Sequence, residues 1–192
     1  MTRRRPLGRA QIGPGFDSVL HAARSGAPWA LERLYLALSP AVAGYLRVQG
    51  AADPEDLTNE VFLGVLRQIA SFDGTEDEFR SWLFTIAHSR VVDERRRSSR
   101  RPQIGGDGLD VDPVGGNAEH DALQRLSSQR VQALCEGLVP DQRDVLLLRL
   151  MAGMTIEAIA EAVGKSEGAV KALQRRGLAN LRKILERDPV SL

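Results

Sequence analysis

Apolar residues recur at steps of three and four along most of the chain, and the pattern breaks clearly between residues 102 and 118. Such steps place side chains on one face of an α-helix, and no segment shows a convincing strand pattern. The interrupting segment holds five glycines and two prolines, which are typical of a linker. The sequence therefore predicts an all-α protein with two small helical domains joined by a flexible linker.

The boundaries follow from the same pattern. We expect a disordered basic tail at residues 1–15, because this stretch is rich in glycine, proline and arginine and has little to bury. The first domain is then 16–101, the linker 102–118 and the second domain 119–192. The expected helices cover residues 16–25, 29–48, 54–69, 76–97, 119–138, 140–151, 156–163 and 167–187.

The segment from Thr155 to Lys183 predicts a helix-turn-helix. Gly164 can take the left-handed conformation that ends a helix, and Ser166 is a good cap for the next one. The second helix carries one apolar stripe, which consists of Val170, Leu173, Gly177, Leu181 and Ile184. A short helix, a glycine turn and a second helix with a basic outer side form the geometry that enters a DNA major groove. Basic residues alone are common on solvated helices, so the spacing carries this prediction.

Charge is clustered although the net charge is only +1. Residues 53–60 hold four acids, which also suit the first turns of a helix, and residues 90–101 hold six arginines. Phe72, Phe79 and Trp82 lie just ahead of the arginines. Aromatic rings beside cations are what a single-stranded nucleic-acid site needs. Aromatic residues at helical spacing are equally typical of a core, and both interpretations stay open.

Several kinds of site are not expected. The single cysteine, Cys135, allows no intramolecular disulfide and suits a reducing compartment. No apolar run approaches the ~18 residues that a membrane span needs, so we expect a cytoplasmic protein without membrane insertion. His21, His88 and His120 are scattered, and neither a Gly-rich phosphate loop nor a nucleophile–base pair appears. We expect no catalytic residues, no metal and no cofactor.

Two blocks of the sequence resemble a known family. DPEDLTNEVFLGVLRQIASFDG, followed by FRSWLFTIAHSRVVDERRR, closely resembles region 2 of bacterial RNA polymerase sigma factors. LVPDQRDVLLLRLMAGMTIEAIAEAVGKSEGAVKALQRRGLANLRK resembles their region 4. Two such regions without an intervening region 3 are typical of the extracytoplasmic-function (ECF) group of the sigma-70 family. The resemblance implies an alternative sigma factor, which binds core polymerase, directs promoter-specific initiation and is not an enzyme.

The resemblance also implies where this chain binds its partners. Region 2 would dock on the β′ clamp helices of core RNA polymerase through Asp56, Leu57, Asn59, Glu60 and Leu63. It would read and melt the −10 element of promoter DNA with Phe72, Asp73, Phe79, Trp82, Arg90, Arg95, Arg96, Arg97 and Arg100. Region 4 would meet the β flap and read the −35 element with Ser166, Glu167, Lys171, Gln174, Arg175 and Arg176. An anti-sigma factor is a further implied partner.

Two departures from the family pattern concern these sites. The family commonly has Arg-Leu where this chain has Leu173-Gln174, so we expect the −35 contacts to shift by a position. Ser89 stands where asparagine is frequent, so a local polar contact there would differ.

Leu146, Leu147 and Leu150 are expected in the core of the second domain.

Two other hypotheses fit the helix-turn-helix. One is a stand-alone helix-turn-helix transcriptional regulator, which would bind duplex DNA without polymerase. The other is a DNA-processing enzyme that carries a helix-turn-helix module. It would need a clustered serine or carboxylate–metal site, and the only candidate cluster is residues 53–60, where helix capping already explains the acids.

Overall fold

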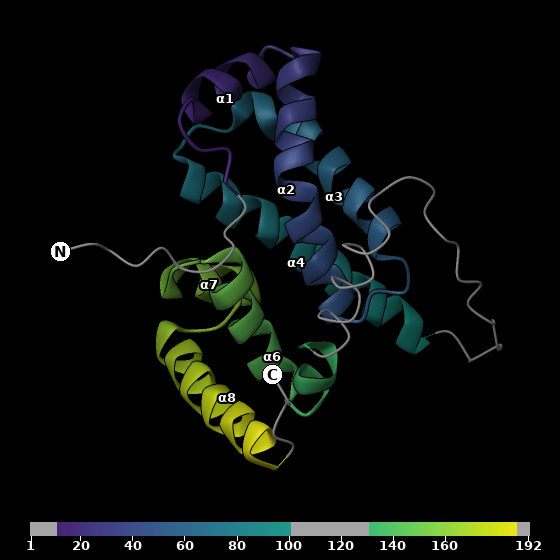
Figure 1. The fold of residues 1–192 in the computed structure, drawn as a ribbon, viewed down its shortest axis with the longest axis vertical. Coiled ribbons are helices and arrows are strands. Elements are labelled where there is room, and N and C mark those ends of the chain that lie inside the picture. The colour runs from purple at the N-terminus through teal and green to yellow at the C-terminus, as the bar shows by residue number, and fades with distance from the viewer. Residues whose placement is uncertain (1–10, 101–130, 188–192) are drawn as a thin grey trace.

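The computed structural model describes residues 11–100 and 131–187, and within them the regular structure is entirely helical. Figure 1 shows the helices in two groups, with α1 to α4 in the upper part of the view and α6 to α8 below. The first group consists of α1 (Phe16–Arg24), α2 (Pro28–Val48), α3 (Pro54–Gln68), η1 (Ile69–Ser71) and α4 (Glu76–Arg100). The second group consists of α6 (Pro140–Leu147), η2 (Leu148–Ala152), α7 (Ile156–Val163) and α8 (Glu167–Arg187).

The all-α fold with two helical domains confirms the expectation from periodicity. Residues 131–136 are also helical, in agreement with the expected helix at 119–138. The proposed linker at 102–118 and the first ten residues of the expected tail lie outside the described residues.

The first domain is a bundle in which α3 packs between α2 and α4. Helix α3 begins where the sequence predicts. The Asp53 carboxylate accepts a hydrogen bond from the Asp56 N–H at 2.8 Å, and Pro54 occupies the first position of the helix. Aromatic rings fill the core, where Tyr45 and Phe84 meet edge to face with centroids 5.4 Å apart. This ring contact holds α4 against α2.

The packed part of the chain begins earlier than the sequence indicates. Ile12 is buried in the core, and its backbone N–H donates to the Glu76 carboxylate at the start of α4. The Gly13 N–H lies 3.4 Å from both oxygens of the same carboxylate. Residues 11–15 therefore depart from the expected disordered tail, because one buried isoleucine and one distant carboxylate hold them against the bundle.

The helix-turn-helix forms as expected. Thr155 caps α7 by accepting from the Ala158 N–H at 3.2 Å, and Gly164 ends that helix with φ of 64° and ψ of 37°. Val170, Leu173 and Gly177 are buried, as the predicted stripe requires. The other two residues of that stripe, Leu181 and Ile184, are half-buried.

The prediction that Leu150 lies in the core is wrong. Leu146 and Leu147 are buried, but Leu150 is 62% exposed. The cause is η2, where the chain leaves α-helical geometry for a π-helical turn. A π-helical turn holds more residues than an α-helical turn, so side chains beyond Leu147 point in directions that a 3.6-residue period does not predict.

The two domains touch each other. Helix α4 contacts both η2 and α7, and α2 also contacts η2. Buried apolar side chains form one continuous cluster that includes Val48 of the first domain and Leu148 and Met154 of the second. The sequence left the relative orientation of the domains open, and the structure shows them packed together.

Candidate polymerase and nucleic-acid interfaces

Four of the predicted polymerase-binding residues share one side of α3. Asp56, Asn59, Glu60 and Leu63 follow helical spacing, and Leu63 is 52% exposed. The Asn59 side-chain oxygen accepts a hydrogen bond from the Tyr35 hydroxyl at 3.0 Å, which fixes it against α2. The result is a mixed acidic and apolar surface, suited to a partner with basic and apolar side chains.

Leu57 does not belong to that surface. Its side chain is 6% exposed and packs in the core, so it is unavailable to a partner. Leu66 is exposed on the same helix, three residues beyond Leu63. Helical spacing from Asn59 and Leu63 was the signal that could have identified Leu66. On α2, Leu36 is a further exposed apolar side chain that the sequence analysis missed.

The predicted aromatic residues gather at the start of α4. Phe72 and Trp82 stack with ring centroids 5.0 Å apart and 18° between the planes, and both are half-buried. Phe79 meets each of them edge-on, but it is 1% exposed. Phe79 is therefore a core residue that supports the other two rings, and only Phe72 and Trp82 are accessible for stacking on a base.

The acidic residues before and within the first turn of α4 have different partners. The Glu78 carboxylate accepts from the Thr75 N–H at 2.7 Å and from the Thr75 hydroxyl at 2.8 Å. These two bonds stabilise the ionised form and lower the pKa of Glu78. The Glu76 carboxylate accepts from the backbone N–H groups of Ile12 and Gly13. Asp73 is almost fully exposed, with the Arg24 guanidinium 3.4 Å away.

The predicted arginines extend along the C-terminal half of α4. Arg97 is exposed, Arg90 is half-buried, and Arg96 lies 3.8 Å from the Asp93 carboxylate. Arg95 has a different environment, because it donates to Gln49, the residue that follows α2, and lies 3.5 Å from Asp144 of the second domain. Helix α4 includes Arg100, whose side chain lies outside the described part of the chain.

The predicted −35 residues follow the outer side of α8. The Ser166 hydroxyl accepts from the Ala169 N–H at 3.3 Å, which confirms its capping geometry. Lys171 and Glu167 pair at 3.2 Å across one helical turn. Arg175 and Arg176 are exposed, and Gln174 is half-buried beside the buried Leu173. The basic side of α8 is thus formed chiefly by the two arginines and Lys171.

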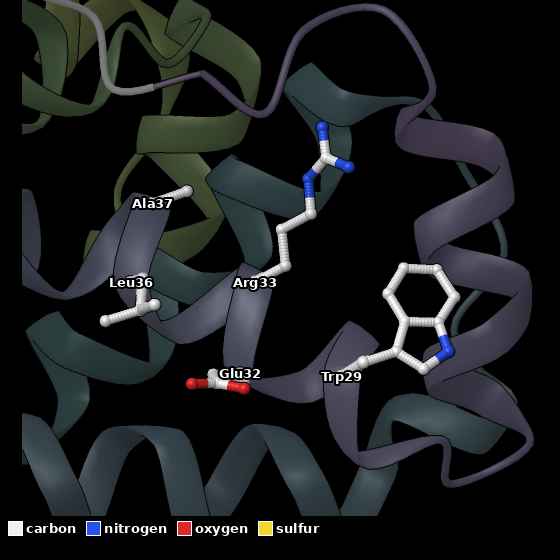
Figure 2. Close-up of a pocket in the computed structure, with 5 residues that line it drawn as sticks. All are labelled: Trp29, Glu32, Arg33, Leu36 and Ala37. Atoms are coloured by element: carbon white, nitrogen blue, oxygen red, sulfur yellow. The ribbon is translucent and has the colours of Figure 1, made fainter.

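A recess on α2 is lined by Trp29, Glu32, Arg33, Leu36 and Ala37. Figure 2 shows the charged ends of Glu32 and Arg33 pointing away from each other. Polar groups that converge on one point are typical of a small-molecule site. This recess lacks that arrangement, and we assign it no ligand.

Metal-binding and membrane-spanning features are absent from residues 11–100 and 131–187. In those residues, histidine, cysteine and carboxylate side chains form no group of three or more that could hold a metal ion. Cys135 is buried, and burial raises the pKa of its thiol. None of the helices described is both long and apolar enough to cross a membrane.

Two regions of the chain match known protein families. Residues 34–101 match the profile of Sigma-70 region 2, and residues 136–183 match Sigma-70, region 4. The ECF RNA polymerase sigma factor SigX of Bacillus subtilis is 33% identical over 147 residues, which cover 74% of this chain and 75% of SigX. This chain belongs to the ECF sigma factors.

A second relative is the ECF RNA polymerase sigma factor BldN of Streptomyces coelicolor, with 35% identity over 173 residues. That match covers 88% of this ECF chain and 66% of BldN, so the chain spans just under two thirds of that relative. Among solved structures, CnrH in complex with the cytosolic domain of CnrY superimposes with a TM-score of 0.64 at 25% identity. The superposition covers 89% of this chain and 97% of CnrH.

The family regions can now be placed on the helices. Region 2 begins at Leu34 within α2 and includes α3 and α4, whereas α1 precedes it. Region 4 includes α6, η2, α7 and nearly all of α8. The aromatic pair and the arginines of α4 therefore belong to region 2, and the basic side of α8 belongs to region 4.

Proposed function

We propose that this ECF sigma factor reads two promoter elements at once, with region 2 reading and melting the −10 element and region 4 reading the −35 element. One observation carries this proposal: the chain presents an accessible Phe72–Trp82 stack near the start of the arginine-bearing α4, and a basic helix-turn-helix in its second domain. The first suits unpaired bases and phosphates, and the second suits duplex DNA.

Binding to core polymerase would use the exposed side of α3. Asp56 and Glu60 supply negative charge, and Leu63 and Leu66 supply apolar area. Complementary charge orients a partner and speeds association, while buried apolar side chains supply affinity. The β′ clamp helices, expected from the family resemblance, are the partner for this surface.

Recognition of the −10 element would combine stacking and charge. An extruded base can stack on the half-exposed Phe72 or Trp82. Arg90, Arg96 and Arg97 lie on the same helix and can neutralise phosphates of the melted strand. Extruding a base costs a few kcal/mol, which these contacts would offset.

Recognition of the −35 element would use α8 in the major groove. Lys171, Arg175 and Arg176 are exposed there, and arginine can make two hydrogen bonds to a guanine edge. Glu167 and Gln174 are candidates for further base contacts, and Ser166 for a phosphate contact at the N-terminus of the helix. Because Gln174 is half-buried, we assign the main contacts to the two arginines.

Several other properties follow from the same proposal. The chain acts without catalytic residues of its own, and it works in the cytoplasm, where polymerase and promoter DNA are found. Residues 102–118 connect the two DNA-reading domains as a linker. CnrH was solved with the cytosolic domain of CnrY bound. We expect this chain also to bind a regulatory protein, and the family resemblance implies that this partner is an anti-sigma factor.

The test is transcription in vitro with core polymerase and genomic DNA fragments. We expect specific start sites that require this chain and that disappear with Glu60→Arg, because a reversed charge on α3 opposes docking. Asp17→Arg is the matched control, since it reverses an exposed carboxylate on α1 and should leave transcription unchanged. Absence of start sites with the wild-type chain would contradict the proposal. Tight binding to a palindromic duplex without polymerase would instead favour a stand-alone regulator.

A further inference from the structure

The contact between the two domains contains a buried polar network. Gln49, at the C-terminal end of α2, is 1% exposed, and its side-chain N–H groups donate to the Tyr45 hydroxyl at 3.1 Å and to the Asp144 carboxylate at 2.8 Å. Arg95 of α4 donates to the Gln49 backbone carbonyl at 2.6 Å and also to its side-chain oxygen. The Tyr45 hydroxyl lies 3.0 Å from the His88 Nδ1. Only Asp144 in this network comes from the second domain.

Asp144 is well enclosed by this arrangement. Its side chain is 13% exposed, and the Arg95 guanidinium 3.5 Å away, 31% exposed, is its counter-ion. A carboxylate so enclosed loses hydration, and its hydrogen bond to Gln49 and the charge of Arg95 compensate for that loss. Removing one partner of such a pair leaves the other uncompensated, which disfavours the packed arrangement of the domains.

The apolar part of the same contact does not by itself determine how the two domains are oriented relative to each other. Apolar side chains of both domains, Leu148 of η2 among them, share one buried cluster, and such burial is non-directional. The hydrogen bond that Asp144 accepts from Gln49 is directional, because it needs the Gln49 N–H at hydrogen-bond distance. The network therefore fixes the register in which region 4 rests on region 2.

This packed arrangement is too short for the two-element reading proposed above. Elements centred about 25 base pairs apart lie about 85 Å apart along B-DNA, at roughly 3.4 Å per base pair. A packed domain of about 90 residues is roughly 30 Å across, so two touching domains extend over roughly 60 Å. The domains must separate before region 2 and region 4 can engage both elements.

Arg95 links separation to nucleic-acid binding. It lies among the arginines of α4 that the proposed function assigns to phosphates, yet Gln49 and Asp144 occupy its guanidinium. A phosphate and the Asp144 carboxylate are both anions that bind guanidinium through the same N–H groups. They cannot use the same N–H groups of Arg95 at once.

We propose that Asp144 acts as an internal clasp: it holds Arg95 and Gln49, keeps the free chain closed, and competes with nucleic-acid phosphate for Arg95. The closed state, in which the two domains are packed together, requires neither DNA nor polymerase. The competition rests on the proposed function, because it requires that the end of α4 binds nucleic acid.

The closed state is tested without DNA or polymerase. Two labels at Leu36→Cys and Leu178→Cys, both exposed positions in different domains, report the distance between domains in a Cys135→Ser background. We expect one short distance for the otherwise unchanged chain. Asp144→Lys should shift it to a longer and broader distribution, because a cation then faces Arg95. Asp141→Lys is the matched control on α6, since Asp141 pairs with Lys165 inside the second domain and should not change the distance.

A distribution that is the same for Asp144→Lys and Asp141→Lys would overturn the clasp. Circular dichroism must show that both variants stay folded. If Asp144→Lys does not fold, Asp144→Asn gives the same comparison against Asp141→Asn, because it removes only the charge. We expect Asp144→Asn to increase the open fraction about tenfold, the effect of losing one charge-assisted hydrogen bond.

The competition is tested by fluorescence anisotropy with a mixed-sequence single-stranded oligonucleotide of about 20 nucleotides. Asp144→Asn should bind several-fold more tightly than the wild-type chain, and Asp141→Asn should bind as the wild type does. Equal affinity for all three would overturn the competition while the distance measurement still decides the clasp. If none of the three binds, the proposed role of α4 fails, and that outcome is distinct from failure of the clasp.

Discussion

Phe72 stacks on Trp82 with 5.0 Å between ring centroids, and the buried Phe79 supports both rings from below the surface. The three aromatic residues that the sequence placed together thus divide into one core residue and two accessible rings. An accessible ring pair can take up an unpaired base by stacking.

We predict that Trp82→Ala reduces the yield of melted promoter about tenfold. Base–aromatic stacking contributes ~1–3 kcal/mol per base, and the variant removes the larger ring of the pair. Permanganate reactivity of −10 thymines, with core polymerase present, measures melting. Trp29→Ala is the control, because it removes an exposed tryptophan from α2. Equal melting by the two variants would contradict a base-stacking role for Trp82.

We predict that Gly177→Ala destabilises the second domain by about 1–3 kcal/mol, the usual cost of overpacking. An added methyl carbon would lie 2.9 Å from Leu146 Cδ1 and 3.3 Å from Gln142 Cβ. Gly168→Ala is the control on the same helix, since an added carbon there meets no atom within 4 Å. Urea unfolding should show that Gly168→Ala is neutral or stabilising, because alanine favours the helix. Equal stability for both variants would contradict the prediction and would show that α6 moves to accommodate the added methyl group.

We predict that stability falls as the pH drops below about 6.5, the usual pKa of histidine. Burial lowers the pKa of His88, so the folded chain keeps His88 neutral while the unfolded chain takes up a proton. The loss is at most about 1.4 kcal/mol per pH unit. Unfolding free energies between pH 7.5 and pH 5.5 measure it. In His88→Asn the slope should be smaller, and an unchanged slope would assign it to other groups.

We predict that Arg175→Ala weakens binding of the holoenzyme to duplex −35 DNA by about 1–3 kcal/mol, the range for a base-reading arginine. Arg187→Ala is the control, because Arg187 is exposed at the far end of α8. Binding should be measured at several salt concentrations. A loss that is equal at all sequences, with a smaller salt slope, would identify a phosphate contact in place of base reading.

Much of this fold could be predicted from residues that lie close together in the sequence. The Asp53 cap, the left-handed Gly164 and the buried Val170–Leu173–Gly177 stripe each depend on residues close together in sequence, and each appears as expected. The same holds for Ser166, whose capping role needs only the next turn of chain.

The parts that sequence did not predict depend on distant contacts or unusual backbone. Leu57 and Phe79 are buried because other helices cover them, and helical spacing alone does not tell which apolar side is covered. Ile12 is held by Glu76, 64 residues away. Leu150 is exposed because a π-helical turn changes the period. Asp144 meets Gln49 across 95 residues and the whole linker, so no local pattern could indicate that Arg95 has an internal partner.

The close packing of Gly177 has a mechanical consequence for the whole second domain. Gln142 and Leu146, one turn apart on α6, press against α8, and Asn180 of α8 donates to the Gln142 side chain at 2.9 Å. Asp144 lies between them in sequence and therefore on the opposite side of α6. One short helix thus contacts the other domain through Asp144 on one side and α8 on the other. Because Gln142 and Leu146 pack tightly on α8, a change in the position of α6 would require α8 to move with it or to lose these contacts.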